Sequence, residues 1–213
     1  MIPALVYGGD EERANKISNW GKWGPDDEIG ALNYLPPDKI VAAAQLIKKG
    51  KVFTLGADLT QDWNEPLWPG RTPSIRFNVK DAAGYLTYRK LPPGGYKSAD
   101  DWIGLYVHGT THTDSLAHTW HGNQIWNGYD EKVTIGMFLK AGIYKAAQHG
   151  MIGRGVLLDI ARFKGVEYLE AGEPITLDDF KKCAEKQGVK IKKGDIILCL
   201  LYTSPSPRDR QKS

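Results

Sequence analysis

Apolar residues at helical spacing predict three helices, over residues 37–49, 134–148 and 176–187. The first follows Pro36, and its apolar stripe consists of Ile40, Val41, Ala44 and Ile47. Thr134 is the expected N-cap of the second helix, whereas Thr176 and Asp179 have the spacing of a capping box at the start of the third. Each predicted helix is followed by a glycine that can end it, namely Gly50, Gly150 and Gly188.

Short apolar runs predict strands between and after these helices. The predicted strands cover residues 52–59, 75–79, 85–88, 103–107 and 155–160, and a further strand begins at 195–198. Residues 60–100 are rich in proline, glycine and tryptophan, so we expect long loops there. Because strands alternate with helices late in the chain, the pattern predicts an α/β fold with a mixed sheet and flanking helices.

The composition is that of one sizeable soluble domain. The chain has 213 residues, of which 41% are hydrophobic, and its mean hydropathy is −0.41. No apolar run approaches the roughly 20 residues that span a bilayer, and the N-terminus lacks the pattern of a signal peptide. Cys183 and Cys199 are the only cysteines, which argues against a disulfide scaffold. We therefore expect a cytoplasmic protein without a membrane partner, and Cys183 as a packed apolar residue.

The net charge of +3 comes mostly from residues 199–213, because only Asp209 offsets the positive charges of Arg208, Arg210 and Lys212 there. No basic stripe with interleaved aromatic residues is present, so we expect no nucleic-acid partner. The same residues resemble the translation of a transposase-type sequencing adapter, and Pro205 and Pro207 would be poor in a core strand. A natural polar tail is the alternative. The adapter interpretation predicts a domain over residues 1–198, cut at its C-terminal end, and a native stop codon after Ser213 in intact reads would refute it.

Four of the five histidines lie within residues 108–121, and His108, His112 and Asp114 have the spacing His-x3-His-x-Asp. Imidazole and carboxylate ligands together suit Zn²⁺, Mn²⁺ or Fe²⁺. On an extended strand His108 and His112 would lie about 13 Å apart, too far to share one ion. We therefore expect the chain to leave strand 103–107 and curl at once, with Gly109 permitting the bend.

A metal ion with open positions lowers the pKa of a bound water and polarises a carbonyl group. His118 follows Asp114 by four residues and is the predicted general acid and base. The alternative is a histidine cluster that satisfies local hydrogen bonds without binding metal. We expect His121 and His149 not to be ligands. No Gly-x-Ser-x-Gly motif is present, which disfavours a serine hydrolase.

Residues 108–118, with His108, His112, Asp114 and His118, resemble the His-x-Gly-Thr-His-x-Asp-x-Pro-x-His signature of the cyclase family of metal-dependent hydrolases, which includes kynurenine formamidase and isatin hydrolase. Residues 19–33, 153–159 and 194–198 also resemble segments of its longer bacterial members. The resemblance implies that His108, His112 and Asp114 bind Zn or Mn and that His118 is catalytic. It also implies a swivelling β/β/α fold, a homodimer, and hydrolysis of a C–N bond in a small-molecule formamide or cyclic amide.

Two features depart from the family pattern. The Gly-Thr of the signature is displaced, and Leu116 replaces its proline. The family supplies a further histidine and glutamate from its C-terminal third, yet no histidine follows His149. Two alternative functions stay open: a cyclase or lactone hydrolase with the same metal centre, and a non-catalytic metal- or ligand-binding protein. Four tryptophans have two possible roles, as the lining of a substrate pocket or as part of the core: Trp63, Trp68, Trp120 and Trp126.

Overall fold

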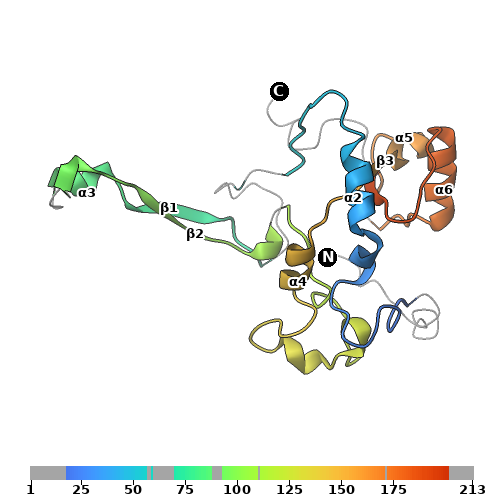
Figure 1. The fold of residues 1–213 in the computed structure, drawn as a ribbon, viewed down its shortest axis with the longest axis horizontal. Helices are drawn as coiled ribbons and strands as arrows, with labels where there is room; N and C mark the ends of the chain where they lie inside the picture. The colour runs from blue at the N-terminus through green and yellow to red at the C-terminus, as the bar shows by residue number, and fades with distance from the viewer. Residues whose placement is uncertain are drawn as a thin grey trace. The chain divides into compact units, whose positions relative to one another are not determined.

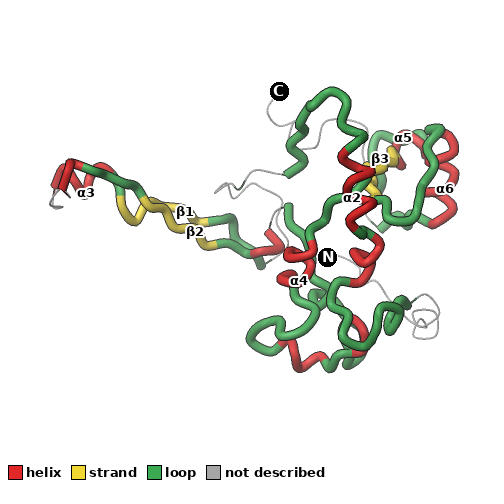
Figure 2. Tube along the Cα trace, viewed as in Figure 1, coloured by secondary structure: helices red, strands yellow, loops and turns green. Residues whose placement is uncertain are grey.

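The structure is a computed structural model that describes residues 18–56, 59, 70–87, 93–109, 111–170 and 172–201 (Figures 1 and 2). The chain divides into two compact units: a larger one formed by Met1–Gly50 with Asp114–Ser213, and a smaller one formed by Lys51–Thr113. Each unit has its own two-stranded sheet, parallel in the larger unit and antiparallel in the smaller one. The predicted mixed α/β class is confirmed.

In the larger unit, β3 (Gly155–Asp159) pairs in parallel with β4 (Ile196–Leu200), and α5 (Ile160–Lys164) and α6 (Leu177–Lys186) connect them. One face of this sheet packs against the helices through a buried cluster of Val156, Leu158, Ile160, Cys183 and Ala184. The strands predicted at 155–160 and from 195 are therefore confirmed over Gly155–Asp159 and from Ile196, whereas Ile160 begins α5. The predicted burial of Cys183 is also confirmed. The domain boundary after Leu198 stays a prediction.

Helix α6 begins with the predicted capping box. The Thr176 side chain accepts a hydrogen bond from the Asp179 backbone N–H at 3.1 Å, and the Asp179 carboxylate accepts one from the Thr176 N–H at 2.7 Å. Both contacts satisfy N–H groups that have no partner within the helix. Gly188 follows the helix with φ of +66°, as expected of a glycine that ends it.

Two predicted helices are shorter in the structure. Helix α2 (Pro37–Ala44) ends before Ile47, and the predicted apolar stripe is exposed at Val41 and Ile47. Helix α4 (Ile143–His149) begins after Gly142, whereas Thr134 ends a 3₁₀ helix over Glu131–Thr134. Helix α4 begins late because Ala141 has a left-handed φ of +53°, and such a residue cannot belong to a continuous α-helix.

In the smaller unit, β1 (Ile75–Lys80) pairs antiparallel with β2 (Asp100–Gly104), and α3 (Ala82–Thr87) follows β1 (Figure 1). The strand predicted over 75–79 is confirmed. The strand predicted over 103–107 begins earlier and ends at Gly104. The strand predicted over 85–88 is wrong, because residues 85–87 belong to α3. The strand predicted over 52–59 is also wrong, because the described residues there, 52–56 and 59, have no strand structure. A short run of apolar residues does not separate a strand from a helix or a loop.

A second buried cluster lies in the larger unit, away from its sheet. Ala117, Ile125 and Ala141 are fully buried, and partly buried side chains pack against them, namely Leu116, Trp126, Tyr129 and Val133. Much of residues 111–142 has no regular secondary structure (Figure 2), so this cluster and its hydrogen bonds fix the backbone there. Within the described part of the chain, every helix is too short or too polar to cross a membrane.

Candidate metal and catalytic site

The histidine-rich segment begins where β2 ends. A tight turn over Val107–Gly109 carries His108, and the Gly109 N–H donates to the Tyr106 carbonyl at 2.8 Å. The guanidinium of Arg71 donates to the carbonyl oxygen of His108 and holds this turn from the other side. The chain therefore curls immediately after the strand, as the ligand spacing required.

His108 and His112 lie together in the smaller unit. Nδ1 of His108 is 2.9 Å from Nε2 of His112, and the two rings meet edge to face with centroids 4.7 Å apart. Two nitrogens bound to one tetrahedral ion at about 2.0–2.1 Å would lie about 3.3 Å apart. The observed 2.9 Å is instead the length of a hydrogen bond in which one ring nitrogen donates to the other, so the pair would share an ion only after this bond is broken and both nitrogens turn toward the ion.

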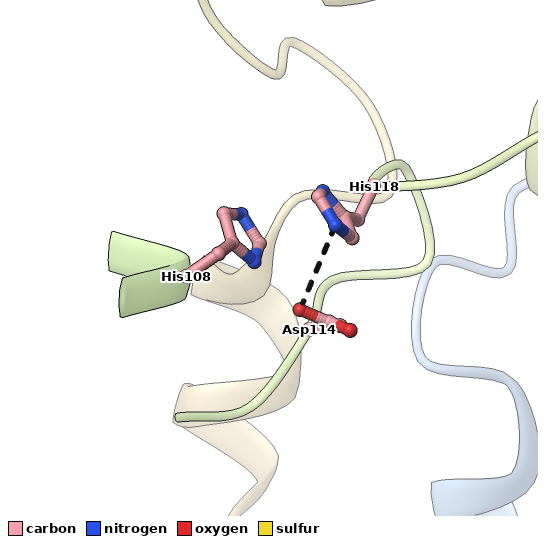
Figure 3. Close-up of side chains that lie close together, drawn as sticks. All are labelled: His108, Asp114 and His118. Carbon is pink, nitrogen blue, oxygen red and sulfur yellow. Dashed lines mark ion pairs between the residues drawn. The ribbon is translucent and has the colours of Figure 1, made fainter. Parts of the chain in front are cut away.

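Asp114 and His118 form a second pair, in the larger unit. Oδ1 of Asp114 lies 4.0 Å from Nε2 of His118 (Figure 3), and the His118 backbone N–H donates to the Ser115 carbonyl at 3.1 Å. This turn places the two side chains on the same side of the loop. The Asp114 side chain is 55% exposed and that of His118 is 26% exposed, so both are accessible to a small ligand.

The donor atoms in these pairs have the chemistry of a transition-metal site. His108, Asp114 and His118 each offer one ligand atom of a type that metal ions bind, and imidazole nitrogen with carboxylate oxygen suits Zn²⁺ or Mn²⁺. His118 is chemically able to serve either as a ligand or as the predicted acid and base. The other two histidines have local roles: His121 lies in an isolated β-bridge with Gln124, and Nδ1 of His149 is 2.9 Å from the Gly150 carbonyl oxygen.

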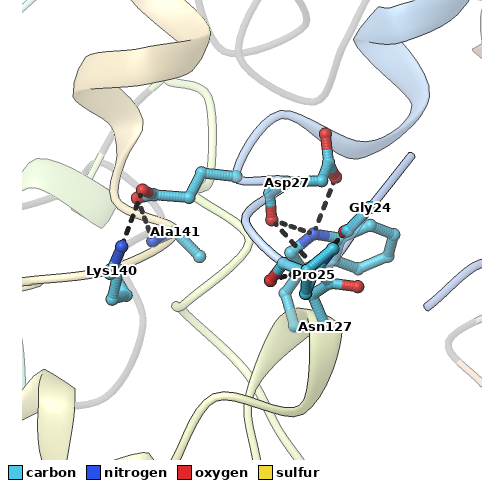
Figure 4. Close-up of polar contacts among 8 residues, drawn as sticks. Gly24, Pro25, Asp27, Asn127, Lys140 and Ala141 are labelled. Carbon is cyan, nitrogen blue, oxygen red and sulfur yellow. Dashed lines mark hydrogen bonds and ion pairs between the residues drawn. The ribbon is translucent and has the colours of Figure 1, made fainter. Parts of the chain in front are cut away.

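Contacts from a distant segment hold the loop of His118, and no local pattern in the sequence predicts them. The Glu28 carboxylate accepts a hydrogen bond from the Ala141 N–H at 2.8 Å and lies 3.4 Å from the Lys140 ammonium (Figure 4). The Ala141 carbonyl in turn accepts from the N–H of Ala117, the residue before His118, at 3.2 Å. Glu28 belongs to residues 19–33, whose family resemblance was the one available signal.

A second set of contacts joins the same segment to the chain that follows His118. The Asn127 side-chain amide donates to the carbonyls of Gly24 and Pro25 at 2.9 and 3.0 Å. The Trp126 indole N–H donates to the Asp27 carboxylate at 3.1 Å (Figure 4). Residues 24–28 thus contact the chain after His118 at two places, residues 126–127 and residues 140–141.

A cavity of about 620 Å³ lies in the larger unit next to this loop. Its wall includes Ser115 and Thr119, which flank His118 in the chain, together with the side chains of Trp20, Trp120 and Trp126. Trp120 is 44% exposed and donates its indole N–H to Glu131 at 2.8 Å, whereas Trp126 also packs in the second buried cluster. Trp63 and Trp68 lie outside the described residues.

Comparison with known proteins identifies the family. The family model named Cyclase matches residues 35–209. A crystal structure of a novel cyclase superposes with a TM-score of 0.75 at 38% sequence identity, over 85% of this chain and 61% of that chain. This chain thus spans about three-fifths of the length of that relative, and no curated protein matches it. The resemblance to the cyclase family is confirmed, and this chain belongs to the Cyclase family.

Proposed function

We propose that this protein is a metal-dependent hydrolase that cleaves the C–N bond of a formamide or cyclic amide. The observation that carries the proposal is the pairing of ligand-type side chains, His108 with His112 and Asp114 with His118, in a member of the Cyclase family. Only Thr113 separates His112 from Asp114. Covalent geometry therefore limits the distance between the Cα atoms of His112 and Asp114 to about 7 Å.

In the proposed site His108, His112 and Asp114 hold a divalent ion, Zn or Mn. When bound, such an ion supplies Lewis acidity, which lowers the pKa of water and polarises a carbonyl group. His118 takes the proton from the attacking water at an imidazole nitrogen and returns it to the leaving nitrogen, because an imidazole exchanges protons readily near neutral pH. The Asp114 carboxylate lies 4.0 Å from Nε2 of His118, so the proposed acid and base stands next to a proposed ligand.

The cavity beside the His118 loop supports a small flat substrate. Three indole side chains, those of Trp20, Trp120 and Trp126, contribute to its wall, and indole faces favour planar apolar groups. A volume of about 620 Å³ is within the range of small-molecule sites. A cytoplasmic homodimer acting on such a substrate, without membrane or nucleic-acid partners, is part of the same proposal.

Metal analysis of the purified protein tests the ligands. After dialysis against Zn²⁺ or Mn²⁺ and removal of free ion, we expect stoichiometric metal in the wild type and in His118→Ala. His108→Ala, His112→Ala and Asp114→Ala should each lose metal, whereas His149→Ala, at the end of α4, should retain it. Metal that is absent from the wild type, or retained by all three ligand variants, would refute the site.

Turnover separates the possible reactions. With N-formylaniline and a cyclic anilide as probes, His118→Ala should lose activity while it keeps its metal. A second candidate, a cyclase or lactone hydrolase that uses the same centre, stays open from the sequence. A wild type that hydrolyses only an aryl lactone would favour that candidate. A wild type that binds metal but cleaves neither class of probe would favour a non-catalytic metal-binding member.

A further inference from the structure

We propose that Glu28 is a positioning residue for His118 and acts through Ala141 and Ala117. The inference rests on the proposed function, in which His118 moves the proton. Its basis is a continuous series of short contacts, all within the larger unit, that runs from one carboxylate oxygen to the residue before His118.

The first contact joins segments 113 residues apart in the chain. Oε2 of Glu28 accepts the backbone N–H of Ala141 at 2.8 Å, and Oε1 lies 3.4 Å from Nζ of Lys140. The Glu28 side chain is only 15% exposed, so water competes weakly for its oxygens. The hydrogen bond to Glu28 and the attraction between the two charges raise the pKa of Lys140, so its ammonium group stays protonated at neutral pH.

Ala141 needs this support because of its backbone conformation. Its φ of +53° lies in the left-handed region, which non-glycine residues occupy only when their surroundings hold them there. Its methyl group is fully buried beside Ala117 and Ile125. Its N–H donates to Glu28 and its carbonyl accepts from Ala117, so both backbone polar groups of Ala141 take part in the series of contacts that leads to His118.

The last contact reaches the proposed acid and base. The N–H of Ala117 donates to the Ala141 carbonyl at 3.2 Å, and the next N–H, that of His118, donates to Ser115 at 3.1 Å. These two bonds fix the peptide planes on either side of Ala117 and so set the direction of the His118 side chain. A displacement of about 1 Å at such a group can cost about 10²-fold in rate.

Two near-isosteric substitutions separate the reach of the carboxylate from its charge. Glu28→Gln keeps an oxygen at the right distance for the Ala141 N–H but removes the charge. Glu28→Asp keeps the charge near Lys140 but is one methylene too short to reach Ala141. Lys140→Ala removes the ion pair and leaves the hydrogen bond of Glu28 in place. Positioning through Ala141 predicts that only Glu28→Asp is defective.

The experiment combines amide hydrogen exchange with steady-state kinetics on the metal-loaded full chain. In Glu28→Asp we expect exchange at the Ala117 and Ala141 amides to accelerate at least 10-fold, and kcat for N-formylaniline to fall about 10–100-fold with KM and metal content unchanged. Glu28→Gln and Lys140→Ala should stay within about threefold of the wild type on every readout.

Unchanged exchange at Ala117 in Glu28→Asp would overturn the inference, as would an equal loss in Glu28→Gln, which would assign the effect to charge. If the wild type has no turnover, or if His118→Ala retains it, the proposed function fails. The exchange at Ala117 still reports in that case whether Glu28 holds the loop.

Discussion

The indole N–H of Trp126 donates to the carboxylate of Asp27 at 3.1 Å, across 99 residues of the chain. The same carboxylate accepts the Gly30 backbone N–H at 2.9 Å and the Asn33 side-chain amide at 2.6 Å. One partly buried side chain therefore satisfies three donors from two distant segments. Hydrogen bonds to a charged acceptor are among the stronger ones, and a donor left unsatisfied in a partly buried place is costly.

Asp27→Ala should lower the free energy of unfolding by about 1–3 kcal/mol, because the Gly30 N–H loses its side-chain acceptor. The Trp126 indole and the Asn33 amide each lose a carboxylate acceptor and are left with a backbone carbonyl, of Asp27 and of Gly30 respectively. Urea denaturation followed by tryptophan fluorescence measures the change. Asp26→Ala is the matched control, since the preceding side chain is exposed and should shift stability by no more than about 0.5 kcal/mol. Equal effects of the two substitutions would contradict the assigned role of Asp27.

Asn127 combines a left-handed backbone with long-range hydrogen bonds. Its φ is +60°, and its side chain binds the carbonyls of Gly24 and Pro25. Asn127→Gly removes the side-chain bonds but tolerates the backbone, whereas Asn127→Ala removes the bonds and is also strained. We expect Asn127→Ala to be the less stable of the two by about 1 kcal/mol, measured by chemical denaturation. The reverse order would show that φ is not left-handed in solution.

Neighbouring leucines on β3 should respond very differently to truncation. Leu158 is fully buried against the helices, whereas Leu157 is 55% exposed on the other face of the sheet. Leu158→Ala should cost about 2–5 kcal/mol, since it leaves a cavity between β3 and α6. Leu157→Ala should cost less than about 1 kcal/mol. Thermal unfolding of both variants tests the assignment of faces, and a larger loss in Leu157→Ala would reverse it.

The capping box makes part of the stability of α6 depend on pH. Hydrogen bonds from Thr176 lower the pKa of Asp179 in the folded protein. A carboxyl group with a lowered pKa stabilises the fold above its unfolded pKa of about 3.9, and this contribution disappears as the pH falls through the folded value. The loss of stability in Asp179→Ala should therefore be larger at pH 7 than at pH 2–3. A constant difference between these pH values would contradict the linkage.

The two cysteines should differ in their reaction with alkylating reagents. Burial raises the pKa of both thiols, but Cys183 is fully buried on α6, where it packs against β3, whereas Cys199 is exposed. In native buffer we expect iodoacetamide to modify Cys199 slowly and Cys183 only after unfolding. Mass spectrometry of tryptic peptides measures both rates, and Cys199→Ser provides the control. Prompt labelling of Cys183 in that variant would show that the sheet opens under native conditions.

Local signals predicted those parts of the fold that local contacts determine. The capping box at Thr176 and the glycine stop at Gly188 involve residues within one or two turns, so the sequence alone located α6. The curl after β2 was also predictable, because His108 and His112 are only four residues apart and an extended chain would hold them too far from one another to share an ion. The pairing of Asp114 with His118 is local in the same way.

Long-range contacts determined the parts that the sequence analysis missed. A helix from Thr134 is reasonable on local grounds, but the carboxylate of Glu28 stabilises a left-handed residue at Ala141 and delays the helix until Ile143. No periodic pattern reveals a partner 113 residues away. For the same reason, the support of the His118 loop by Asp27 and Asn127 could be found only in the folded chain.

The arrangement of contacts has a consequence for the order of folding. Strands β3 and β4 and their two helices form one continuous stretch of chain, so their packing closes only short loops. The loop of His118 is held by Glu28 and Asp27, whose partners lie across about half the chain, and each doubling of loop length adds about 0.6 kcal/mol of closure entropy. The stretch from β3 to β4 should therefore fold early. The loop of His118 should be among the last parts of this unit to assemble.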